Sequence, residues 1–129
     1  MRPIRVFVLS ESRLLRETFV HAFKKQSDLV VMGDCSRSVE ANRLMAQSPC
    51  DVLLVDSSSS QWNSRAAEGF RSAFPYMKII LFNTDRGQLP HSKFEEERVA
   101  AYLSKESSAD DVIVTVRSVA QREAFHPLV

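Results

Sequence analysis

The stretch CDVLLVD at residues 50–56, with the four serines at residues 57–60 that follow it, decides how this chain folds. Four consecutive apolar residues between two aspartates are too few for an ordinary helix, and they suit a strand buried on both faces. Asp56 then lies at the carboxyl end of that strand, where open α/β sheets bind their ligands. Asp56 is therefore a candidate functional residue, and the alternative is a turn residue that caps the serine-rich loop.

Composition is that of a folded domain. The 129 residues are 44% hydrophobic and 26% charged, which suits a single globular domain and argues against disorder. We predict one domain over residues 1–124 and a tail or linker start at 125–129. The net charge of +1 gives no electrostatic reason for this span to bind nucleic acid or an acidic membrane.

The cysteines and the apolar runs indicate where in the cell the protein is found. Cys35 and Cys50 have neither metal-ligand spacing nor the density of a disulfide scaffold, so we interpret them as reduced packing residues. No stretch approaches the roughly 20 apolar residues of a membrane span. We therefore predict a cytoplasmic protein that is neither exported nor embedded in a membrane.

Short apolar runs alternate with helical patterns along the whole chain. Besides residues 52–55, the predicted strands are 4–9, 29–32, 77–82 and 99–103. The predicted helices are one from residue 14 capped by Ser12, one capped by Ser36 or Ser38, one over 62–74, a short one within 86–98, and one capped by Ser107 or Ser108. This alternation predicts an α/β fold with a parallel, doubly wound sheet covered on both faces.

Polar residues follow four of these strands and should meet at one edge of the sheet, because parallel strands end together. They are Ser10 and Glu11, Asp56, Asn83 and Thr84, and Lys105. Two carboxylates at close range repel each other and favour a divalent cation or an ammonium group. Mg²⁺ bound by one or two carboxylates together with water and phosphate oxygens fits this inventory.

At these residues the chain resembles the receiver domains of bacterial two-component response regulators, along nearly its whole length. The matching segments are 4–12 with 15–17 (the first strand, acidic pair and helix), 51–56 (the phosphoacceptor strand), 101–105 (the fifth strand with its lysine) and 107–111 (the last helix start). The last segment is most similar to the subfamily that carries a carboxyl-terminal helix-turn-helix output domain.

The resemblance implies a flavodoxin-like fold with strand order 2-1-3-4-5. Asp56 would be the nucleophile that accepts a phosphoryl group from a histidine kinase, giving an acyl phosphate. A weakly held Mg²⁺ would bridge Glu11 and Asp56, with Ser10 contributing only through water, and Lys105 would stabilise the phosphoryl charge.

The resemblance also implies a way of reading the phosphoryl group. The loop after the fourth strand, at Asn83 and Thr84, and the aromatic Tyr102 would form the switch. The chain would be at most a slow catalyst of its own phosphorylation and dephosphorylation, and not a metabolic enzyme.

Several positions depart from the receiver pattern. Ser10 replaces the first acid, and residues 57–62 replace the usual hydrophobic residue and Met-Pro-Gly. Asn83 aligns with the usual hydroxyl residue while Thr84 lies one position later, and Glu106 replaces a proline. Two hypotheses stay open: a working phospho-receiver, and a degenerate receiver that binds partners or dimerises without phosphorylation.

Two further expectations concern ligands and partners. An enzyme that binds flavin or nucleotide on the same fold would need a glycine-containing phosphate loop after the first strand, and residues 10–16 contain no glycine. We also predict a dimer, or a tendency to dimerise, through an apolar row on the last helix. The row is Val112, Val116, Val119 and Ala120, and the alternative, which is the commoner case, is that it is the core-facing stripe of the helix.

Overall fold

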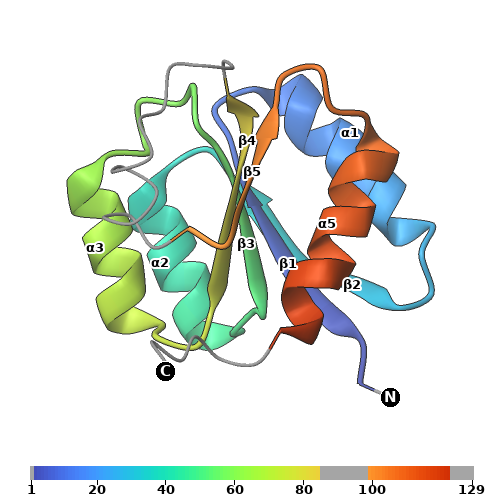
Figure 1. Ribbon diagram of the computed structural model, residues 1–129. Coiled ribbons are helices and arrows are strands. Elements are labelled where there is room, and N and C mark those ends of the chain that lie inside the picture. The colour runs from blue at the N-terminus through green and yellow to red at the C-terminus, as the bar shows by residue number, and fades with distance from the viewer. Residues whose placement is uncertain (1, 85–98, 123–129) are drawn as a thin grey trace.

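Five parallel strands form one sheet in the order β2-β1-β3-β4-β5 in the computed structural model, which describes residues 2–84 and 99–122 (Figure 1). The strands are β1 (Ile4–Leu9), β2 (Leu29–Cys35), β3 (Val52–Asp56), β4 (Lys78–Thr84) and β5 (Ala101–Ser104). The helices in the described ranges are α1 (Arg13–Lys24), α2 (Ser38–Gln47), α3 (Ser64–Ala73) and α5 (Ala109–Gln121). The predicted flavodoxin-like fold class and strand order are confirmed.

The helices cover both faces of the sheet, α1 and α5 on one and α2 and α3 on the other (Figure 1). Alternate residues of β3 supply the two cores. Val52 and Leu54 pack on the α1 and α5 side, whereas Leu53 and Val55 pack on the α2 and α3 side. Every residue of β3 is buried, so the prediction of a strand covered on both faces is confirmed.

Strand β2 extends three residues beyond the predicted end at residue 32. A register shift between Val6 and Phe7 lets β1 pair with Gly33 and the two residues after it. A Cβ on Gly33 would lie only 2.8 Å from Phe7 Cε2, so the glycine makes room for the ring rather than ending the strand.

Strand β4 is also longer than predicted, and the prediction that Asn83 and Thr84 lie after it is wrong, because both belong to the strand. The fifth strand begins at Ala101 rather than at residue 99.

Helix starts follow local hydrogen bonding. Ser12 caps α1 by accepting from the backbone N–H of Leu15, and Ser108 caps α5 in a reciprocal capping box with Asp111, as the sequence predicts. The predicted serine cap of α2 is wrong. The capping position is Arg37, and the next residue, Ser38, donates its N–H to the Gln61 side chain at 2.9 Å.

Helix α3 begins later than predicted, at Ser64 rather than at residue 62. The side chain of Asn63 supplies its cap by accepting from the N–H of Ala66. A capping residue must itself be non-helical, so it sets the start of the helix.

The apolar row of α5 faces the core. Val112, Val116 and Val119 are buried, and Ala120 packs against them, so the row is the core-facing stripe and cannot supply a dimer interface. The predicted helix within 86–98 and the predicted tail at 125–129 lie outside the described residues. Within 2–84 and 99–122, no helix is both long and apolar enough to cross a membrane.

Candidate functional site

The polar residues at the carboxyl edge of the sheet gather around Asp56. This aspartate ends the central strand β3, between β1 and β4, and it is only 3% exposed. Ser10 follows β1 directly and Asn83 lies in β4, so the topology brings three predicted site residues to one place. Sequence reasoning predicted this meeting, but not which atoms would bond.

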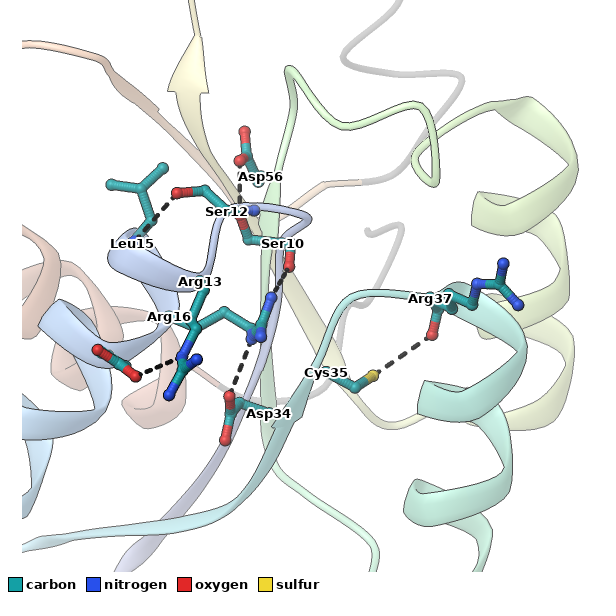
Figure 2. A network of polar contacts seen from close by, with 10 residues as sticks. Ser10, Ser12, Arg13, Leu15, Arg16, Asp34, Cys35, Arg37 and Asp56 are labelled. Carbon is teal, nitrogen blue, oxygen red and sulfur yellow. Dashed lines mark hydrogen bonds and ion pairs between the residues drawn. The ribbon is translucent and has the colours of Figure 1, made fainter.

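Four donors contact the Asp56 carboxylate. Oδ2 accepts from Ser10 Oγ at 2.7 Å, as Figure 2 shows. Oδ1 accepts from the Ser58 backbone N–H at 3.0 Å, from Ser58 Oγ at 2.6 Å and from the Asn83 side-chain amide at 3.2 Å. These hydrogen bonds offset the cost of burying a carboxylate.

Ser10 is held so that its hydroxyl proton points at Asp56. Its backbone N–H donates to the carbonyl oxygen of Cys35 at 3.1 Å, and its Oγ accepts from the N–H of Ser12 at 3.0 Å. Because the N–H of Ser12 uses one of the oxygen lone pairs, the hydroxyl proton is directed to the carboxylate. Ser10 itself is fully buried, at 0% exposure.

Arg16 fixes the other side of Ser10. Its Nη1 donates to the Ser10 carbonyl oxygen at 2.8 Å, while its Nε pairs with Asp34 Oδ2 at 3.0 Å (Figure 2). Arg16 therefore joins α1, the end of β1 and β2. This clamp sets the backbone from which the Ser10 hydroxyl reaches Asp56.

Glu11 faces the serine-rich loop. Its Oε1 accepts from Ser60 N–H at 2.8 Å, from Ser59 Oγ at 2.9 Å and from Ser60 Oγ at 3.1 Å. The hydrogen bond from the Ser60 backbone and those from the two serine hydroxyls lower the pKa of Glu11, against smaller raising effects of desolvation and of the Asp56 charge. The two carboxylates thus lie within electrostatic range of each other.

Asn83, and not Thr84, supplies the β4 side chain at Asp56. Its φ of 62° lies in the left-handed region, which Asn adopts more readily than most residues. The positive φ coincides with a register shift between β4 and β5, and the amide also donates to Ser58 Oγ at 3.0 Å. The Thr84 hydroxyl instead donates to the Leu103 carbonyl of β5 at 2.9 Å.

The remaining predicted residues lie on or after β5. The backbone N–H of Lys105 donates to the carbonyl oxygen of Thr84 at 3.1 Å, which fixes the lysine backbone beside the end of β4. Tyr102 pairs with Leu81 across the β4–β5 ladder, and its side chain packs against the core on the α2 and α3 side.

Three serines of the site were missed as functional residues by sequence reasoning. Ser58, Ser59 and Ser60 satisfy the two carboxylates, whereas the sequence indicated only a turn. One signal was available: an aspartate whose side chain accepts from the backbone two residues later is a common turn arrangement, and Asp56 and Ser58 form it.

These residues do not fit a dedicated Mg²⁺ centre. No group of three or more His, Cys, Asp or Glu side chains that could hold a metal occurs within residues 2–84 and 99–122. Glu11 and Asp56 already accept several donors, and Ser10 presents a proton, not a lone pair, to the carboxylate. A cation would have to displace these hydrogen-bond donors, which are neutral hydroxyl and N–H groups.

Known proteins with similar sequences are transcriptional regulators. The chain is 30% identical over 125 residues to the transcriptional regulatory protein YxjL of Bacillus subtilis (strain 168), covering 95% of this chain and 56% of that protein. It is 24% identical over 128 residues to the transcriptional regulatory protein DegU of Brevibacillus brevis, covering 98% of this chain and 54% of that protein. The chain therefore spans about half the length of the curated relatives it matches.

Solved structures show the same fold. The signal receiver domain of the putative response regulator NarL from Mycobacterium tuberculosis superposes with a TM-score of 0.79 at 21% identity, covering 95% of this chain and 100% of that one. No protein-family model matches the chain. The chain therefore has the fold of a response-regulator receiver domain, and its sequence is similar to the sequences of these transcriptional regulatory proteins.

Proposed function

We propose that this domain accepts a phosphoryl group on Asp56 from the phosphohistidine of a sensor histidine kinase. The observation that carries the proposal is the set of donors around Asp56 Oδ1, which come from Ser58 and Asn83 at the carboxyl edge of the sheet. Donors placed around a nucleophilic oxygen can also contact the oxygens of a phosphoryl group attached to it.

In the proposed transfer, a lone pair of Asp56 Oδ1 forms the new O–P bond. The P–N bond to the kinase histidine breaks, and the imidazole nitrogen keeps that electron pair and takes up a proton. The product is an acyl phosphate on Asp56, which water can later hydrolyse. Asn83 and the Ser58 backbone N–H then stabilise the phosphoryl oxygens, and the Lys105 side chain contributes positive charge.

We propose that the phosphoryl group is read through the end of β4 and through β5. Asn83 contacts Asp56 directly, and the neighbouring Thr84 is bonded to Leu103 of β5. A movement of Asn83 toward the phosphoryl oxygens would therefore pull on β5, which carries Tyr102. This coupling supports a switch in which the domain changes how it contacts an output domain or partner.

The wider role follows from the relatives. Because the curated relatives are about twice as long and are transcriptional regulatory proteins, we propose that residues 1–124 are the regulatory domain of a cytoplasmic transcriptional regulator. Dimerisation, if it accompanies this role, must use a surface other than the buried row of α5. Any Mg²⁺ at Glu11 and Asp56 is bound weakly, in the millimolar range or poorer, because Ser10 brings no charge.

The test is the intact mass of the protein after incubation with a small phosphodonor such as phosphoramidate or acetyl phosphate. We expect one added phosphoryl mass that hydroxylamine removes, as it does from acyl phosphates. Asp56→Asn should lose the adduct, whereas Asp51→Asn, at the opposite end of β3, should keep it. Lys105→Ala should keep the adduct and lose the structural response, followed by NMR shifts in β5.

No adduct at forcing donor concentrations would contradict the proposal. The domain would then act as an interaction module that works without phosphorylation. An adduct that persists in Asp56→Asn would also contradict it, because another residue would be the acceptor.

A further inference from the structure

We propose that this site does not depend on a divalent cation, because hydroxyl and amide donors hold its carboxylates in the cation's place. The inference rests on the proposed phosphoryl acceptance by Asp56 and deepens it. Its basis is the mismatch between the donors present and an Mg²⁺ centre.

The two carboxylate oxygens of Asp56 face different donors. Oδ1 faces Ser58 and Asn83, the donors proposed to pass to the phosphoryl group, and Oδ2 faces Ser10. Because Oδ1 already accepts three hydrogen bonds, a cation held by this carboxylate would have to use Oδ2. At 2.7 Å and 0% exposure, the Ser10 hydroxyl already contacts that oxygen.

The absence of a charge at Ser10 also lowers the need for a cation. A carboxylate at position 10 would add a negative charge next to Asp56 and would repel an incoming phosphoryl group. Serine removes that charge, so less repulsion remains for a cation to offset. The lower charge makes a divalent cation both less strongly attracted and less necessary.

Hydrogen bonds to Glu11 link the two loops of the site. Glu11 accepts three hydrogen bonds from Ser59 and Ser60, which tie the segment after β1 to the loop after β3. A cation bridging Glu11 and Asp56 would make the same link. Here serine hydroxyls and a backbone N–H make it directly, so the site is assembled without an ion.

Arg16 is a positioning residue in this arrangement. Its side chain is only 17% exposed and joins the Ser10 carbonyl to Asp34. The clamp keeps the Ser10 backbone fixed, so that the hydroxyl does not depend on a bound ion for its orientation.

The first arm of the experiment uses no phosphodonor. The domain is titrated with Mg²⁺, and NMR shifts of the Ser10, Glu11 and Asp56 backbone amides are followed, together with the melting temperature in excess EDTA. For the unaltered domain we expect no saturation of the NMR shifts below about 10 mM Mg²⁺ and no change in melting temperature. The Ser10→Asp variant should bind Mg²⁺ with at least roughly tenfold higher affinity than the unaltered domain.

The second arm measures the rate of the phosphoryl adduct with Mg²⁺ and with EDTA. We expect the two rates to agree within about twofold in the unaltered domain. The Ser10→Asp variant, by contrast, should form the adduct at least roughly tenfold faster with Mg²⁺ than with EDTA. The matched control is Ser48→Asp, which adds the same charge at an exposed position after α2 and should behave like the unaltered domain.

Ser10→Ala tests the hydroxyl itself and avoids introducing a charge into a buried position. Its adduct should form more slowly, and Mg²⁺ should not restore the rate. Rescue of Ser10→Ala by Mg²⁺ would overturn the inference, because a cation and not the hydroxyl would then be the neutralising group.

Other outcomes separate this inference from the proposed function. An adduct that forms only with Mg²⁺ keeps the phosphoryl acceptor and overturns cation independence. No adduct in either condition overturns the phosphoryl acceptor, while tight saturation by Mg²⁺ in the first arm overturns cation independence without any phosphorylation.

Discussion

Two aspartates flank the same buried strand, and the protein satisfies them in opposite ways. Asp51, before β3, accepts from the Arg5 backbone and guanidinium at 2.9 to 3.3 Å and from Arg2 at 3.1 Å. Asp56, after β3, is more deeply buried and is contacted by the hydroxyl and amide groups of Ser10, Ser58 and Asn83. Cationic partners fix one end of the strand, and small movable donors surround the other.

The difference separates structure from reactivity. Burial would raise the pKa of Asp51, but hydrogen bonds from the Arg5 side chain and backbone, with the charges of Arg5 and Arg2, outweigh it and hold that pKa below its usual value. A carboxylate locked to guanidinium groups is a poor nucleophile. Hydroxyl and amide donors, by contrast, can move with a group attached to Asp56.

The largest expected effect is on stability at the amino end of the strand. Asp51→Asn should lower the free energy of unfolding by about 2 kcal/mol, because an amide NH₂ must then face a backbone N–H or a guanidinium. Asp56→Asn should cost less, about 1 kcal/mol, because the amide oxygen can keep the three hydrogen bonds on the Oδ1 side and only the contact with the Ser10 hydroxyl is lost. Urea denaturation of the two variants measures these losses, and equal losses would show that the two aspartates do not differ in their structural role.

The pH dependence of stability gives a second test of the difference between Asp51 and Asp56. The pKa of Asp51 is lowered in the folded state from an ordinary 3.8, so its contribution is present above about pH 4 and is lost as the pH falls through the lower folded value. The stability gap between the unaltered domain and Asp51→Asn should therefore narrow from pH 6 to pH 3. Denaturation midpoints at both pH values test this, and a constant gap would show that the ionised carboxylate is not what stabilises this end.

A smaller effect is expected from the clamp at the carboxyl end. Arg16→Gln should cost about 1 kcal/mol, because it removes a half-buried ion pair with Asp34 and a hydrogen bond to the Ser10 carbonyl. The substitution should also shift the NMR signal of the Asp56 carboxyl carbon. Arg13→Gln, which breaks an exposed pair with Glu17, is the control and should leave that signal unchanged.

The smallest effect is expected at the exposed carboxylate. Ser60→Ala removes a hydroxyl donor from Glu11 but keeps the backbone donor, which is the larger cause of the lowered pKa. The pKa of Glu11 should rise slightly toward its ordinary value while stability hardly changes. NMR titration of the Glu11 carboxyl carbon measures this, and a large loss of stability would mean that the loop link is structural.

The fold was predictable because its signals are local or periodic. The run at 52–55 predicts a strand covered on both faces, and Ser12 and Ser108 predict helix starts, since each depends on neighbours within a few residues. The row in α5 shows the limit of periodicity. It reveals an apolar stripe but not whether the core or another molecule covers it.

The site was predictable only in part. The predicted ends of the parallel strands placed Asp56, Ser10 and Asn83 at one edge, but they could not supply the serine contacts, which depend on how the loop after β3 returns toward Glu11. The Arg16 clamp joins residues 18 positions apart in sequence through a side chain, and no pattern in the chain marks it. The bulge at Asn83 depends on pairing with β5, about 20 residues away.

The left-handed backbone at Asn83 constrains how this domain can change. Receivers that it resembles have a hydroxyl residue at the aligned position, and restoring one here by a single substitution to threonine would place a β-branched side chain at a φ of 62°. The hydroxyl and the regular strand must therefore return together, with a new register between β4 and β5. The amide at this position and the bulge that carries it are therefore coupled, because changing the residue strains the backbone that the bulge imposes.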